Sequence, residues 1–291
     1  MATGMTRANV GRPCFQYLLG KVERATLVRR YKRFLADVEL CTSTCVEEPR
    51  TSELGDAKHP HDKKRSRSEG SHVEAKTTVY CPNTGPMVGL LDASAIDVCV
   101  QRASEGTKRK YPHTLELVRA APSGCWVGVH SARANAIVDH ALSSHALPFL
   151  EPYVSYRREV RFGDDARLDF QLERPDGTTT YVEVKSVTLA LELGSEGRVA
   201  TFPDTRSERA RKHLRALVRA RALGHGSCCL FLVQRDDCVS FRPALSLDPE
   251  YAACLQSALE AGVQAYALGA RWWLDEDDVA HLTCTDLLPW S

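Results

Sequence analysis

The chain of 291 residues is 43% hydrophobic and 26% charged, which is typical of a soluble globular protein and excludes a collagen-like or wholly disordered one. Its 38 basic side chains nearly balance 37 acidic ones, and no apolar run approaches the roughly 18 residues that a membrane-spanning helix requires. The length predicts about two domains. Residues 1–112 carry 19 basic and 13 acidic side chains, whereas residues 113–291 carry 19 and 24, so the first part is suited to a polyanionic partner.

The eleven cysteines are scattered, include no CxxC pair and in part lie in apolar stretches such as Ser227–Leu232. This pattern predicts reduced, buried thiols in a reducing compartment, so we expect a soluble intracellular protein, most simply a cytoplasmic one. Two targeting alternatives stay open. The first 22 residues contain three basic side chains and no acid, as an organelle transit peptide does. The basic run Lys63–Arg67 is compatible with nuclear import.

The N-terminal half predicts β structure. Residues 1–21 are expected to be a flexible extension. From Arg24 to Val38, β-branched and aromatic residues are interleaved with basic ones, which favours a strand. Further short strands are expected at Thr77–Cys81 and Asp97–Val100, with a Gly/Pro turn between them. Together these strands predict a small barrel over residues 22–112.

Residues 46–76 interrupt this domain with a segment almost free of large apolar side chains. Such a segment buries too little surface to offset the entropy of ordering it, so we expect a disordered insertion between two strands. A zinc site is disfavoured because its candidate ligands match no standard spacing and half of them lie in the insertion. These ligands are Cys41, Cys45, His59 and His61.

Helical and β patterns alternate in the second half, residues 113–291. Amphipathic stretches predict helices, and apolar or alternating runs bounded by turn residues predict strands. The helices are expected at Ala134–Leu147, Ser207–Leu223 and Asp248–Ala261, and the strands at Arg158–Phe162, Arg167–Leu172, Thr180–Val187, Ser227–Gln234 and Val263–Leu268. This order predicts an α/β domain with a mixed central sheet flanked by helices.

Two acidic residues and a lysine fall within the predicted strands. Asp169 lies on the second strand, and Glu183 and Lys185 project from one face of the third because side chains alternate with a period of two. Carboxylate oxygens suit Mg²⁺ or Mn²⁺, which neutralises charge in phosphodiester hydrolysis, while a lysine can hold water or phosphate. The alternative is an edge ladder with a Glu–Lys pair. Glu159, on the first strand, is either a third carboxylate or a surface residue beside arginines.

Two basic surfaces are candidates for nucleic-acid contact. The predicted strand from Arg24 interleaves basic and aromatic residues, as an OB barrel that holds single strands does. The predicted helix from Ser207 carries six basic residues against one acid, Glu208. The alternatives are a core position for Tyr31 or Phe34 and an ordinary solvated helix face. The candidate contacts are Arg29, Arg30, Tyr31, Lys32, Arg33, Arg167, Arg209, Lys212 and His213.

Six specific runs stand in order along the chain: residues 24–38 (RATLVRRYKRFLADV), 81–87 (CPNTGPM), 108–117 (KRKYPHTLEL), 181–189 (YVEVKSVTL), 202–204 (FPD) and 208–214 (ERARKHL). Together they strongly resemble the sugar fermentation stimulation protein family. The resemblance extends from about residue 22 to the predicted strand at Val263. The chain departs from the family pattern in the insertion at 46–76, in Tyr80, where histidine is common, and in Ala210, where glycine is usual.

The resemblance implies an N-terminal OB-fold domain followed by a domain similar to the PD-(D/E)xK restriction-endonuclease fold, with DNA as the partner. It assigns Asp169 to the acid of the nuclease motif, and Glu183 and Lys185 to its ExK element. The function implied is DNA binding with a divalent-metal phosphodiesterase site, of endonuclease or exonuclease type. A non-catalytic DNA-binding regulator of sugar metabolism is the alternative, and an RNA-processing nuclease is a third reading. Strand preference and oligomeric state stay open.

Overall fold

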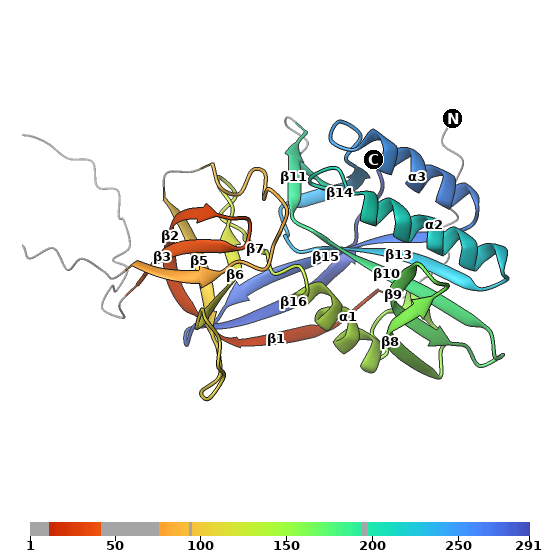
Figure 1. Cartoon of the computed structure of the whole chain (residues 1–291), viewed down its shortest axis with the longest axis horizontal. Coiled ribbons are helices and arrows are strands. Elements are labelled where there is room, and N and C mark those ends of the chain that lie inside the picture. Colours follow the sequence, from red (N-terminus) through yellow and green to blue (C-terminus); the bar gives the residue numbers. More distant parts are fainter. Residues whose placement is uncertain (1–11, 42–75, 93–94, 194–196) are drawn as a thin grey trace, which may run out of the picture.

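The structure is a computed structural model that describes residues 12–41, 76–92, 95–193 and 197–291 (Figure 1). Apart from Lys76, the expected insertion at 46–76 lies outside the described residues. The expected flexible extension is wrong for part of its length. Strand β1 (Gln16–Lys21) pairs antiparallel with β16 (Val279–Leu287), so the N-terminal segment is joined to the last strand of the chain.

Five strands close into the expected OB barrel. They are β2 (Glu23–Tyr31), β3 (Leu35–Leu40), β4 (Lys76–Tyr80), β5 (Ile96–Arg102) and β6 (His113–Arg119). The antiparallel order is β4-β3-β2-β5-β6, and a parallel pairing of Tyr80 with Thr114 joins β4 to β6. The interior is aliphatic, with Val38, Val79, Val98, Val100 and Leu115 completely buried. Because β6 begins at His113, the barrel extends past residue 112, where the first domain was expected to end.

The predicted single strand from Arg24 to Val38 is two strands. Residues Lys32–Phe34 form a turn between β2 and β3, and Lys32 and Arg33 adopt left-handed φ values of 50° and 64°. Such values favour Gly, Asn or Asp, none of which occurs at these positions, so no residue type here indicated a turn. Lys32 and Arg33 therefore lie at the end of a hairpin and not within a strand, where the sequence predicted them.

The second unit is the expected α/β domain with a mixed sheet (Figure 1). Its strands run in the order β7-β15-β13-β10-β9-β8; β10, β13 and β15 are parallel, and the other neighbours are antiparallel. The bounds are β7 (Trp126–Gly128), β8 (Ser155–Phe162), β9 (Ala166–Glu173), β10 (Thr179–Val187), β13 (Gly226–Val233) and β15 (Gln264–Leu274). Pairing of β7 with β6 makes the sheet continuous with the barrel.

Helices cover both faces of this sheet. The α1 helix (Arg133–Ser143) shares a hydrophobic core with Leu230 of β13, whereas α2 (Glu208–Ala222) and α3 (Pro249–Glu260) share a core with Phe231. Successive residues of one strand thus serve opposite layers. Since Glu183 pairs with Cys229 and Lys185 with Phe231 in the parallel ladder, both functional candidates lie on the face covered by α2.

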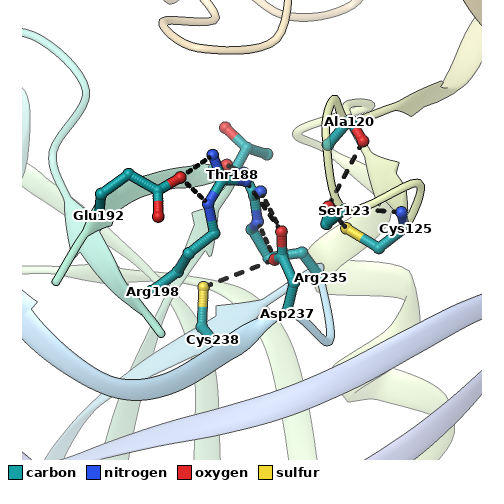
Figure 2. Close-up of polar contacts among 9 residues, drawn as sticks. All are labelled: Ala120, Ser123, Cys125, Thr188, Glu192, Arg198, Arg235, Asp237 and Cys238. Atoms are coloured by element: carbon teal, nitrogen blue, oxygen red, sulfur yellow. Dashed lines mark hydrogen bonds and ion pairs between the residues drawn. The ribbon is translucent and has the colours of Figure 1, made fainter. Parts of the chain in front are cut away.

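A small second sheet, β11-β12-β14, was not predicted. It consists of β11 (Leu189–Glu192), β12 (Arg198–Phe202) and β14 (Cys238–Pro243). Arg235 joins it to the main sheet (Figure 2): its buried guanidinium donates to both carboxylate oxygens of Asp237, at 2.6 and 2.7 Å, and to the Thr188 carbonyl at 2.8 Å. Arg198 donates to the same carboxylate at 3.0 Å. These bonds fix the C-terminal end of β10.

The charge of Asp237 belongs to this structural cluster. Burial alone would raise its pKa, but the hydrogen bonds and charge of Arg235, together with Arg198, hold that pKa well below its ordinary value.

Among the described residues, no helix is long and apolar enough to cross a membrane.

Candidate active site

Asp169 is held where two strands separate. The ladder between β9 and β10 ends at the pair Phe170 and Val182. Beyond it, the Val184 amide donates to Asp169 Oδ2 at 2.7 Å, and Asn135 Nδ2 of α1 donates to Oδ1 at 2.7 Å. The carboxylate therefore replaces a backbone partner of β10 and is fixed from both the sheet and the helix.

The surroundings of Asp169 disfavour its charge. Burial, and after it the negative charge of Glu183, raise the pKa of Asp169 to about 6, although the two hydrogen bonds and Lys185 act in the opposite sense. Two carboxylates in one poorly solvated site repel each other. A cation between them would offset both the burial of their charges and this repulsion.

Glu183 is almost fully buried, at 2% exposure. Its Oε1 accepts from Lys185 Nζ at 2.6 Å and contacts His213 Nδ1 of α2. Its Oε2 is buried and has no hydrogen-bond partner among the described residues. Burial alone would raise the pKa of Glu183, but the charge of Lys185 and the contact with His213 hold it below its ordinary value. The surroundings of Glu183 thus favour its charged form and leave Oε2 without a partner among the described residues.

The predicted group of Asp169, Glu183 and Lys185 lines one cavity of about 470 Å³ between the two domains. The barrel domain contributes Asn83–Gly85, directly after β4, and the loop after β12 contributes Asp204. These two walls touch so closely that a Cβ on Gly85 would lie 2.3 Å from the Asp204 carboxylate. Burial raises the pKa of Asp204, against the effect of the Met87 amide that donates to it. Sequence reasoning missed Asn135 and Asp204 as members of this site.

Glu159 lines the same cavity without joining the two central carboxylates. It lies opposite Asp169, between the pairs Arg158–Phe170 and Val160–Leu168, with a left-handed φ of 51°. Its side chain is 51% exposed, and its ion pair is with Arg167, at 4.0 Å. Among the residues that the structure describes, no group of three or more His, Cys, Asp or Glu side chains is arranged to hold a metal ion.

Several predicted nucleic-acid contacts of the barrel have partners within the protein. Arg29 Nε donates to Asp37 at 2.8 Å, and the Tyr31 hydroxyl donates to the same carboxylate at 3.0 Å. Arg30 Nη2 donates to two backbone carbonyls, those of Arg33 and Asn83, at 2.6 Å each. Lys32 and Arg33 are exposed, and their side chains have no partner among the described residues.

Some basic residues of α2 likewise have partners within the protein, and others do not. Arg211 binds Asp248 at 2.8 Å, and Arg219 binds Asp165 at 2.8 Å, so acids from distant parts of the sequence neutralise this helix. Neither Arg209 nor Lys212 has a side-chain partner within the described part of the chain, and Arg209 lines the cavity together with Arg167. His213 faces the carboxylate site through Glu183, a contact that its place in the sequence did not indicate.

Comparison with known proteins identifies relatives over most of the chain. A model of the sugar fermentation stimulation protein RE domain matches residues 132–276, and a model of the SfsA N-terminal OB domain matches residues 65–129. A sugar fermentation stimulation protein homolog of Rhodospirillum centenum is 40% identical over 84% of this chain and 88% of its own. Another, of Shewanella sp., is 39% identical over 88% and 93%.

A solved structure shows the same fold. The structure of Pyrococcus furiosus SfsA in complex with Ca²⁺ superposes with a TM-score of 0.69 at 20% sequence identity. It covers 94% of this chain and 98% of its own.

Proposed function

Because this chain belongs to the sugar fermentation stimulation protein family, we propose that it is a nucleic-acid phosphodiesterase whose Asp169 and Glu183 hold a divalent metal ion. The observation that carries this proposal is the buried carboxylate of Glu183, whose Oε2 has no partner among the described residues. DNA is the proposed partner. The continuous sheet and the shared cavity support an enzyme in which the barrel domain presents the strand to the carboxylates.

The residues present fit a hard divalent ion. A buried carboxylate oxygen without a donor is costly, and so is the charge on Asp169, whose pKa is raised to about 6. A cation that both carboxylates contact would remove the two costs together. An oxygen donor set suits Mg²⁺ or Mn²⁺. The Pyrococcus furiosus relative was solved with Ca²⁺, which also takes oxygen ligands.

The other residues of the cavity have separate tasks. Lys185 and His213 hold Oε1 of Glu183 and so leave Oε2 to the ion. When bound, the ion would supply positive charge against the negative charge that develops on phosphate. Lys185 also lines the cavity, where its ammonium can hold a water or a phosphate oxygen. Arg209 and Arg167 stand at the same cavity and can bind the neighbouring phosphates.

Cleavage of end-labelled DNA, single- and double-stranded, tests the proposal in EDTA and in Mg²⁺ or Mn²⁺. The wild-type chain should cleave only with metal, and Asp169→Asn or Glu183→Gln should lower the rate by about 100-fold or more while DNA affinity changes only a few-fold. Glu276→Gln is the matched control, since Glu276 is an exposed carboxylate in the turn after β15 and lies outside the cavity-lining set. Equal cleavage by the wild type and by a variant that carries both Asp169→Asn and Glu183→Gln would remove the assignment. Metal-independent binding without cleavage would instead favour the non-catalytic regulator.

A further inference from the structure

The depth of the carboxylates limits what can reach them. Glu183 and Lys185 are 2% and 9% exposed and lie in a cavity of about 470 Å³, which is the size of a pocket for a small ligand. The barrel segment Asn83–Gly85 and Asp204 form part of its wall. A phosphodiester on a rigid duplex lies on the outside of a cylinder. Enzymes that act on a base inside a pocket take single strands or first extrude the nucleotide. Carboxylates recessed in this half-open cavity are likewise reached more readily by a flexible single strand than by a rigid duplex.

Two exposed aromatic residues lie on the barrel, in segments linked to the cavity wall. Phe34 and Tyr80 are 46% and 42% exposed, unusual values for large apolar rings. Phe34 ends the turn after Lys32 and Arg33, which are exposed and have no side-chain partner among the described residues. Aromatic faces beside unpaired cations are what single-stranded nucleic acid requires, because bases stack on the rings and phosphates meet the cations. We call Lys32, Arg33, Phe34 and Tyr80 the rim patch.

Backbone contacts join the rim patch to the cavity. The Cys81 amide donates to the Phe34 carbonyl at 2.8 Å, so the two rings belong to adjacent chain segments. Arg30 Nη2 donates both to the Arg33 carbonyl and to that of Asn83, a residue of the cavity wall. Tyr80 lies three residues before Asn83, a span of about 10 Å at most. The turn that carries Phe34 and the end of β4 that carries Tyr80 are therefore both linked to the segment that forms the cavity wall.

We infer that the substrate is single-stranded nucleic acid, which stacks on Phe34 and Tyr80 and enters the cavity between the two domains. This inference rests on the proposed function and adds the strand state of the substrate and the residues that select it. Arg30 is a positioning residue in this arrangement because it holds the turn against the cavity wall. Arg29 and Tyr31 stabilise the barrel through Asp37 instead of contacting the strand.

Binding of labelled oligo(dT), oligo(rU) and a DNA duplex of equal length, measured by fluorescence anisotropy in EDTA, tests the inference. Phe34→Ala and Tyr80→Ala should each weaken single-strand binding roughly 5- to 150-fold and change duplex binding by about twofold or less. Leu18→Ala, which removes another exposed apolar side chain, on β1 at 63% exposure, is the control and should have no effect. The two single-stranded probes distinguish a DNA substrate from an RNA substrate.

A second pair of variants separates stacking from general apolar contact. Phe34→Leu with Tyr80→Leu keeps apolar surface but removes the rings, and should lose single-strand affinity as the alanine variants do. Phe34→Tyr with Tyr80→Phe should retain it. Unchanged single-strand affinity in the alanine variants, or duplex cleavage as fast as single-strand cleavage with Mg²⁺, overturns this inference but leaves the proposed nuclease intact. Absence of cleavage of every probe overturns the proposed function instead.

Discussion

Replacement of Asp169 by Asn should make the metal-free protein more stable at neutral pH, although it removes a residue assigned to catalysis. The folded state disfavours the ionised Asp169 carboxylate through burial and through the charge of Glu183. Asparagine has nearly the same shape and no charge. The substitution therefore removes the repulsion and keeps the side chain's size.

The pKa of Asp169 sets the magnitude and the pH range. Its rise from 3.8 to about 6 means that the folded state binds more protons than the unfolded state between these values. Wild-type stability therefore falls as pH rises through this window and stays lowered above it. At about 1.4 kcal/mol for each pH unit the full effect is about 3 kcal/mol, and partial contact with water reduces it to between about 1 and 3 kcal/mol.

The hydrogen bonds of the site allow the substitution. The Val184 amide needs an acceptor, which the amide oxygen of the new Asn provides. In the wild type, Asn135 donates to the other carboxylate oxygen of Asp169. After the substitution, rotation of the Asn135 amide by a half-turn lets its oxygen accept from the NH₂ group of Asn at position 169. Both hydrogen bonds to residue 169 therefore survive the substitution.

Thermal unfolding in EDTA at a series of pH values measures the effect. Asp169→Asn should have the higher Tm above pH 6, by roughly 2–4 °C for each kcal/mol, and the difference should vanish near pH 4. With Mg²⁺ at about 1,000 times its Kd the order should reverse, because only the wild type then gains about 4.1 kcal/mol, which exceeds its deficit. A variant less stable than wild type in EDTA at pH 8 would refute this account of the site.

Three further changes test other parts of the structure. Asp237→Asn should cost roughly 3–5 kcal/mol in urea unfolding at pH 7, because it leaves buried Arg235 unpaired; since the pKa of Asp237 is lowered, only the wild type should lose this contribution as pH falls below about 4. Lys32→Ala with Arg33→Ala should flatten the salt dependence of single-strand binding by up to about 1.4 in log–log slope, and an unchanged slope would place the strand elsewhere. Gly85→Ala should slow cleavage by displacing the Asp204 carboxylate, and adding Asp204→Ala should restore part of the rate if the clash is the cause.

Regular periodicity made the second domain largely predictable. The helix expected from Ser207 to Leu223 is α2 with Ser207 as its N-cap, and the strand expected at Thr180–Val187 is β10 within one residue. The period of two along β10 also placed Glu183 and Lys185 on one face. Short strands with weak patterns, such as β11 and β12, were not predicted because nothing in their local sequence distinguishes them from loops.

Contacts between residues that are distant in the sequence could not be predicted from it. Asp165 and Asp248 pair with arginines of α2, so the helix that looked like a free basic surface is largely neutralised. Asn135 is an ordinary polar residue of a helix until the fold brings it 2.7 Å from Asp169. The turn at Lys32–Phe34 uses left-handed backbone without a glycine or asparagine, which local propensity does not anticipate.

Titration of the metal-free protein with Mn²⁺, followed by calorimetry, measures whether Asp169 and Glu183 hold a metal ion. Wild-type protein should bind Mn²⁺ at a saturable site, and Asp169→Asn and Glu183→Gln should each abolish or strongly weaken this binding, whereas Glu276→Gln should bind as wild type does. Wild-type affinity in both carboxylate variants, or no binding by the wild type at millimolar Mn²⁺, would contradict a metal site at Asp169 and Glu183.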